Sequence, residues 1–186
     1  MAVRPFELVI DWDLTNPTQG PILQFMLKSL EKAQCPISAD NIRCVMSTEI
    51  KDSDKWVAGG FYPPENRIDL FADQLASKQH AQDTIVHELI HAFDQCTARV
   101  DWTNCLHLAC SEVRAASLSG DCKLTREMKR GYLMHFFKHH QQCVYRRAVL
   151  SLKQSPHCGN DNVPHESVMA VWDSCFADTA PFDEIY

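Results

Sequence analysis

Hydrophobic residues recur at helical spacing in five stretches of the chain, and each stretch predicts a helix. Ser77 suits the N-cap of the second helix, because its hydroxyl can accept a hydrogen bond from a backbone N–H of the first turn. Gly120 is expected to end the third helix, since glycine readily takes the left-handed conformation found at helix ends. The predicted helices cover residues 21–34, 77–98, 104–118, 125–153 and 163–176.

Three shorter stretches between the first two helices are typical of β-strands. They cover residues 42–50, 56–62 and 67–71, and the segment 63–66, which begins with two prolines, forms the turn between the last two. Together with the helices, they predict an α+β fold with a small sheet and additional C-terminal helices.

Length and composition fit one folded domain. The chain has 186 residues, of which 45% are hydrophobic, and this is enough to bury one sizeable core. Within a single domain over 1–186, we expect a tail at 1–20, a core that carries the chemistry at 21–122 and further helices at 123–186. No stretch approaches about 18 uninterrupted apolar residues, so any membrane contact is expected to be peripheral.

The charge balance disfavours one class of partner. The chain has 18 basic and 24 acidic residues, which gives a net charge of −6 with neutral histidines, and no run of lysine or arginine stands out. Because contacts to phosphates need concentrated positive charge, we do not expect a nucleic-acid partner.

The most informative segment is His87-Glu88-Leu89-Ile90-His91, in the second predicted helix. Two histidines four residues apart lie one turn apart on the same face, so both imidazoles can reach one tetrahedral zinc ion, Zn2+. Glu88, about 100° round the helix from His87, is placed to take a proton from the attacking water rather than to bind the metal. The pattern predicts a zinc metalloendopeptidase with a zincin-like fold. A buried helix whose histidines only bond to backbone carbonyls is the alternative.

A catalytic zinc site needs a third protein ligand and an open fourth position. The third predicted helix offers His107 and Glu112, which are about 140° apart around a continuous helix, so we expect only one of them to bind the metal. We favour Glu112, which follows His91 by 21 residues, because a glutamate on a second helix is the arrangement of gluzincin-type proteases. His107 then supports a metal ligand or donates a hydrogen bond to the tetrahedral oxyanion. Asp94, nearly in line with His87, is a candidate to orient that histidine or to make a helix-end contact.

These residues also carry a family resemblance. Four blocks of the chain, in order, resemble the Atp23 family of mitochondrial inner-membrane metalloproteases. The blocks are 87–94 (HELIHAFD), 100–102 (VDW), 107–115 (HLACSEVRA) and 118–122 (LSGDC). The resemblance implies that His87 and His91 are zinc ligands and that Glu88 is the catalytic acid and base. It also implies a location on the intermembrane-space side of the mitochondrial inner membrane.

The resemblance further suggests a substrate and two alternative functions. Members of the family mature the mitochondrially encoded subunit 6 of the ATP synthase, so the precursor of that subunit is the expected protein substrate. Members also help to assemble the membrane sector of the ATP synthase without needing proteolysis, and an assembly factor is therefore the first alternative. The vertebrate member was separately described as a Ku-binding protein, which makes a nuclear partner in DNA repair the second.

A substrate-binding strand can also be predicted. In zincins the last strand before the metal helix commonly forms the upper rim of the active-site cleft, where a substrate can add as an extra strand. The strand predicted at 67–71 is the candidate for this rim, and an ordinary edge strand is the alternative.

One feature departs from the gluzincin pattern, because Ala116 stands where these proteases often carry an aspartate, four residues after the third ligand.

Nine cysteines in 186 residues suggest an oxidising compartment. No two of them are spaced as CxxC, so neither a thioredoxin-like motif nor a zinc ribbon is supported. Their dispersal predicts a structural disulfide framework, and the odd number leaves at least one thiol over. Buried, reduced cysteines are the alternative. Members of the Atp23 family tend to carry a CxxC pair around the position of Cys44. This chain reads Cys44-Val45-Met46-Ser47 there.

Overall fold

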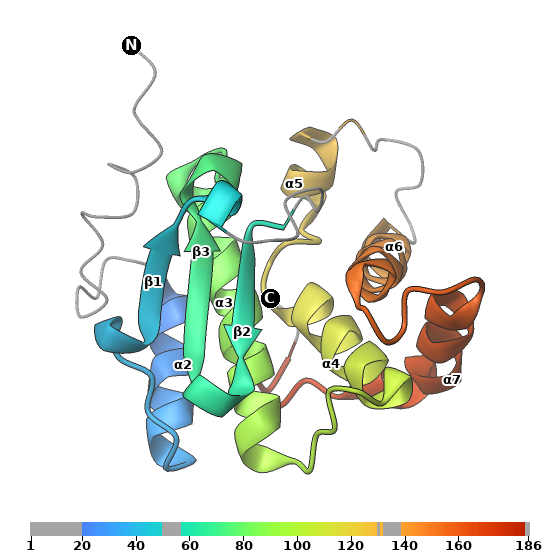
Figure 1. The fold of residues 1–186 in the computed structure, drawn as a ribbon, viewed down its shortest axis with the longest axis horizontal. Coiled ribbons are helices and arrows are strands. Elements are labelled where there is room, and N and C mark those ends of the chain that lie inside the picture. Colours follow the sequence, from blue (N-terminus) through green and yellow to red (C-terminus); the bar gives the residue numbers. More distant parts are fainter. Residues whose placement is uncertain (1–19, 50–56, 130, 132–138, 185–186) are drawn as a thin grey trace. The chain divides into compact units, whose positions relative to one another are not determined.

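The structure, a computed structural model, describes residues 20–49, 57–129, 131 and 139–184 (Figure 1). These residues form six α-helices and one three-stranded sheet, so the predicted α+β class is confirmed. The chain divides into two compact units, Met1–Thr97 and Ala98–Tyr186, each described separately below. The expectation of a single domain stays a prediction, and the predicted tail at 1–20 lies almost entirely outside the described residues. No helix among the described residues is long and apolar enough to span a bilayer.

The first unit packs two helices against one face of the sheet (Figure 1). Apolar side chains of the first helix and of the central strand form its core, with Leu23, Met26, Leu30, Ile68 and Leu70 all fully buried. The elements are α2 (Pro21–Lys32), β1 (Ile42–Val45), β2 (Gly59–Tyr62), β3 (Arg67–Phe71) and α3 (Lys78–Thr97).

β3 is the central strand of the sheet. The strand order is β1-β3-β2, with β1 parallel and β2 antiparallel to β3. The prediction that residues 67–71 form the rim or an edge strand is therefore wrong, because neighbours on both sides use the backbone hydrogen-bonding groups of β3. On the face opposite the helices, the buried carboxylate of Asp69 accepts hydrogen bonds from Arg43 at 2.8 and 2.9 Å and from Arg67 at 3.1 Å.

The first predicted strand is shorter than expected. β1 ends at Val45, and a 3₁₀ turn, Ser47–Glu49, follows it. The turn is fixed by Asp73, which accepts hydrogen bonds from the hydroxyl and the backbone N–H of Ser47. The local pattern of hydrophobic residues does not depend on a hydrogen-bond partner 26 residues away. The pattern therefore predicted a strand that is longer than the observed one. The start of the second predicted strand, at residue 56, lies outside the described residues.

Helix α3 matches its prediction closely. It covers Lys78–Thr97, and the backbone N–H of His80 donates to Ser77 Oγ at 3.1 Å, which confirms Ser77 as the N-cap. The start of β2 lies directly over this helix, since a Cβ placed on Gly59 would come within 2.7 Å of Thr84 Cγ2. The strand therefore approaches the helix as closely as it does because residue 59 has no side chain.

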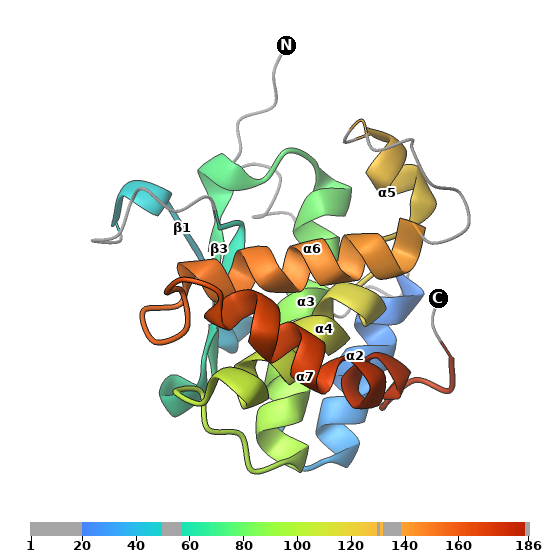
Figure 2. The ribbon, with the colours of Figure 1, turned by 90° about the vertical axis from the view of Figure 1, so that its right-hand side faces the viewer.

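The second unit is a helical cluster around α4 (Cys105–Leu118). Figure 2 shows α6 (His139–Gln154) and α7 (Val163–Ala177) packed over α4. A short helix, α5 (Leu124–Lys129), precedes α6. Small and aliphatic side chains of α4, α6 and α7 meet in one buried cluster. The buried cluster contains Ala109, Val113, Ala116, Cys122, Cys143, Val144, Ala148, Val149, Leu152, Cys158, Val168 and Cys175.

The long helix predicted at 125–153 is not continuous. α5 ends at Lys129, and Gly131 has a φ of +83°, a value that a right-handed helix cannot contain. Glycine adopts such values without steric cost, and it therefore often interrupts a helix. The apolar periodicity on either side of Gly131 led to the prediction of one helix, although the glycine indicated a break. Gly120, with a φ of +86°, follows the end of α4 as predicted.

The disulfide framework is confirmed. Cys35–Cys96 joins the segment after α2 to the end of α3 in the first unit. Three bridges cross-link the second unit, and every one of them involves α4 or the residues just after it. They are Cys105–Cys158, Cys110–Cys175 and Cys122–Cys143. Cys44 is the free cysteine, and its partial burial raises the pKa of its thiol.

Candidate metal centre

Helix α3 presents the two histidines of the motif one turn apart. Their ring centroids lie 4.8 Å from each other, with the ring planes at 82°. Ile85, Leu89 and Ile90 are fully buried, which fixes the rotation of the helix about its axis. That rotation leaves His87 half-buried and His91 5% exposed. The imidazoles are thus held by a rigid element rather than a loop.

Helix α4 presents Glu112. The helix begins after Asn104, whose side chain accepts hydrogen bonds from the backbone N–H groups of Leu106 and His107 at 2.9 and 3.4 Å. Val113 lies in the apolar cluster of the second unit and Glu112 is 7% exposed. Its carboxylate is therefore largely removed from bulk water.

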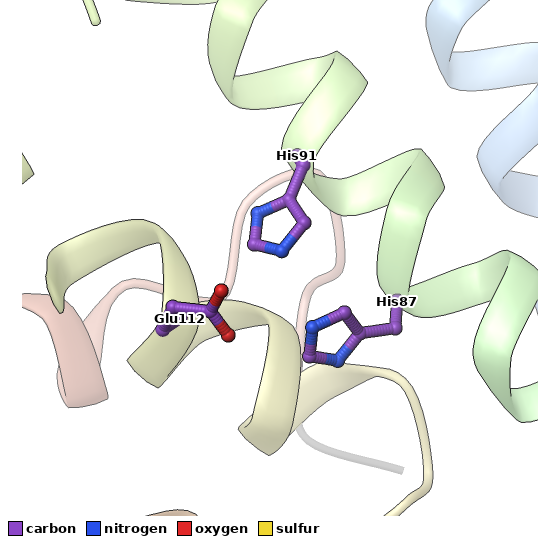
Figure 3. Close-up of side chains that lie close together, drawn as sticks. All are labelled: His87, His91 and Glu112. Atoms are coloured by element: carbon purple, nitrogen blue, oxygen red, sulfur yellow. The ribbon is translucent and has the colours of Figure 1, made fainter. Parts of the chain in front are cut away.

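The donor atoms of His87, His91 and Glu112 lie within 4.8 Å of one another. Figure 3 shows the two imidazoles and the carboxylate pointing toward one another. Among the described residues, this is the group of histidine, cysteine, aspartate and glutamate side chains whose geometry could hold a metal ion. Two nitrogen donors and one carboxylate are the donor set of a catalytic zinc site, which keeps its fourth position for water. The residues present therefore fit such an ion.

Glu88 follows His87 on α3 and is 6% exposed. It does not belong to the group of potential ligands, and its role in proton transfer stays a prediction. The negative charge of Glu88 affects the pKa of Tyr62, at the end of β2. Burial raises the pKa of the Tyr62 hydroxyl, and the negative charges of Asp69 and Glu88 raise it further against the opposing effect of Arg67 and Arg43. The tyrosine therefore stays protonated in neutral solution.

The two other residues predicted for this site lie outside the group. His107 is exposed in the first turn of α4, where its Nδ1 accepts a hydrogen bond from the backbone N–H of Asp101 at 3.1 Å. Asp94 is buried on α3. Their roles beside the metal stay predictions. Ala116 lies in the apolar cluster of the second unit, where an aspartate would have to be buried among hydrophobic side chains.

Arg114 was missed by the sequence reasoning. It lies two residues after Glu112 and is only 5% exposed, and its guanidinium binds the segment that follows α7. A charged residue between Val113 and Ala115 on a buried helix is a signal of a side chain that needs polar partners. Its ion-pair partner, Asp178, is 64 residues away and has no such signal in the sequence.

Comparisons with known proteins give a consistent result. A sequence model described as the peptidase M76 family matches residues 11–183. A mitochondrial inner membrane protease atp23 from Sclerotinia sclerotiorum is 43% identical over 178 residues, covering 95% of this chain and 73% of its own length. The protein of the same name from Schizosaccharomyces pombe is 40% identical over 169 residues, covering 91% of this chain and 88% of its own. No solved structure matches this chain.

Proposed function

This chain belongs to the peptidase M76 family, and we propose that its active centre is a zinc site held by His87, His91 and Glu112. The chain is a metalloendopeptidase of the Atp23 type and a protein of the mitochondrial inner membrane. The observation that carries the proposal is the convergence of two imidazoles and one carboxylate. We assign the fold, on the same ground, to the minimal gluzincin type of zincin.

The chemistry follows from the donor set and its neighbour. When bound by His87, His91 and Glu112, a zinc ion would supply Lewis acidity toward the scissile carbonyl and would lower the pKa of the attacking water to about 7. Glu88 accepts the proton of that water and returns it to the leaving amine. Because Glu88 is 6% exposed, bulk water competes little for the proton during this transfer.

We propose that a substrate strand adds to β2. β3 is excluded, because both of its edges are paired within the sheet. Among the described strands, β2 pairs only with β3, and it packs on α3, the helix that carries both histidines. Backbone groups on an edge strand are the usual partners of an extended peptide, so β2 offers the rim that was predicted for residues 67–71.

The substrate and the side of the membrane are further parts of the proposal. The relatives are named as mitochondrial inner membrane proteases. Together with the resemblance in the four sequence blocks, they support the precursor of ATP synthase subunit 6 as the substrate. The resemblance and the four disulfides support peripheral attachment on the intermembrane-space side, because an oxidising environment suits disulfide bonds.

Replacement of the proton-transfer residue tests the activity. We expect Glu88→Gln to keep the zinc and to lose at least about 100-fold in the rate of peptide hydrolysis, because an amide cannot accept the proton. The assay is cleavage of a peptide library by zinc-loaded protein, followed by mass spectrometry. Glu166→Gln is the control, since it removes an exposed carboxylate on α7. Peptidase activity that survives in Glu88→Gln would contradict the assignment.

The alternatives make different predictions. An assembly factor with dispensable proteolysis predicts that Glu88→Gln still supports ATP synthase assembly in cells that lack the native protein, and a failure to rescue counts against it. A nuclear partner of a DNA-repair protein predicts reduced cysteines. The four intramolecular disulfides weigh against this second alternative.

A further inference from the structure

We propose that Arg114 and the C-terminal segment 178–182 position the carboxylate of Glu112 for metal binding. The inference rests on the proposed function, because it assumes that Glu112 is a ligand. Neither the buried arginine nor the segment after the last helix takes part in the chemistry described above. Arg114 is a positioning residue in this account, since it acts through α4.

The turn of α4 that carries Glu112 is bonded to other segments on the side of the helix opposite to Glu112. Residues two positions before and after Glu112 lie about 160° away from it around the helix axis. These residues are Cys110 and Arg114. Cys110 forms the disulfide with Cys175 near the end of α7, and Arg114 binds the residues that follow α7. One covalent link and one ionic link therefore hold the same turn, and both lead to the end of α7.

The guanidinium of Arg114 binds both backbone and side-chain oxygens of that segment. It donates to the backbone carbonyls of Asp178 at 3.0 Å and Ala180 at 2.6 Å, and it pairs with the Asp178 carboxylate at 2.6 Å. The planar guanidinium can bind several acceptors at once, which an ammonium group does with less geometric definition. Since Arg114 is 5% exposed, loss of these acceptors would leave a charge buried.

The segment itself is folded and anchored. The backbone N–H of Phe182 donates to the carbonyl of Thr179 at 2.8 Å, and Thr179 Oγ1 donates to the carbonyl of Phe182 at 3.0 Å. The backbone N–H of Ala180 donates to Asp178 Oδ1 at 3.0 Å. The Phe182 side chain is 4% exposed, so the segment is anchored by apolar burial as well. The carbonyls that Arg114 binds are therefore presented in one arrangement, and this arrangement restrains how α4 can turn or slide.

Zinc affinity of the full chain, measured by competition with a chelator at neutral pH, tests the inference. We expect Arg114→Gln to bind zinc about 10- to 100-fold more weakly, the range seen when groups that orient metal ligands are removed. Arg114→Lys should have an intermediate zinc affinity, because lysine keeps the positive charge but lacks the planar guanidinium that binds several acceptors at once. The control is Arg146→Gln, which breaks another ion pair of the second unit, with Glu127 at 2.7 and 2.8 Å, on α6 instead of α4. It should leave zinc affinity within about twofold of the wild type.

The outcomes separate the inference from the proposed function. Wild-type protein that binds no zinc contradicts both. Zinc-binding wild type with unchanged affinity in Arg114→Gln, or equal weakening in Arg114→Gln and Arg146→Gln, overturns the inference alone. If Arg114→Gln fails to fold by circular dichroism, Asp178→Asn replaces it, since this variant keeps both carbonyl acceptors. We expect it to weaken zinc binding by about threefold through the loss of one charged acceptor, and unchanged affinity would overturn the inference.

Discussion

Gly59→Ala should destabilise the protein through one identifiable contact. The added Cβ would lie 2.7 Å from Thr84 Cγ2, and the next neighbours, the Asp69 carbonyl oxygen and Leu70 Cδ2, would be 3.2 and 3.3 Å away. Carbon atoms pack best at about 3.5–4.0 Å, so strand and helix must separate by nearly 1 Å. Thr84 cannot rotate away easily, because its hydroxyl donates to the His80 carbonyl at 2.9 Å and its side chain is branched at Cβ.

The magnitude combines two opposing effects. Overpacking of this kind costs about 1–3 kcal/mol, and replacing a glycine by alanine returns about 0.4–1 kcal/mol by restricting the unfolded chain. The expected net loss in the free energy of unfolding is about 1–2 kcal/mol. For a chain of this size, each kcal/mol lowers the melting temperature by about 2–4 °C, which gives a decrease of roughly 2–8 °C.

A double-mutant cycle identifies the contact. Thr84→Ser removes the Cγ2 methyl group and keeps the hydroxyl that binds His80, and alone it should cost about 1 kcal/mol for the lost apolar group. Combined with Gly59→Ala, it should recover most of the loss, with a coupling energy of about 1–2 kcal/mol. The assay is thermal unfolding of the oxidised protein by circular dichroism. Additive effects of the two changes, within about 0.3 kcal/mol, would refute the argument from steric contact.

Three further predictions concern the cysteines and one histidine. Denatured, unreduced protein should gain one maleimide by mass spectrometry and lose it in Cys44→Ser; more than one label would contradict the four disulfides. Replacing Cys110 and Cys175 together by serine should lower the free energy of unfolding by about 2–4 kcal/mol in urea titrations. Burial lowers the pKa of His140, although the Ser117 carbonyl that faces its Nε2 at 3.3 Å opposes this. Because the unfolded chain then binds the proton more readily, stability should fall as the pH drops below about 6.5, and His140→Gln should reduce that dependence in melting curves.

Local signals made much of the fold predictable. The bounds of α3 and α4 follow from apolar spacing together with an end signal, Ser77 before one helix and Gly120 after the other. The pairing of the motif histidines follows from helix geometry alone, since four residues make about one turn. Such features depend on contacts within a few residues, and the sequence therefore contains them directly.

Contacts between distant residues were not predictable in the same way. The central place of β3 depends on a parallel partner 26 residues earlier, and an isolated strand pattern reads the same at the centre of a sheet as at its edge. The bond of Arg114 to Asp178 spans 64 residues. For the third ligand, spacing offered both His107 and Glu112. The structure brings Glu112 near the histidines, while His107 is exposed and bonded to the backbone of Asp101.

The zinc content of the purified protein tests the central claim most directly. Plasma mass spectrometry on protein prepared without chelators should find about one zinc per wild-type chain, because three protein ligands suffice for a catalytic site. Glu112→Ala should lose the metal, and His107→Ala, measured in the same run, should keep it. A wild type without zinc, or loss of zinc in His107→Ala but not in Glu112→Ala, would contradict the proposed site.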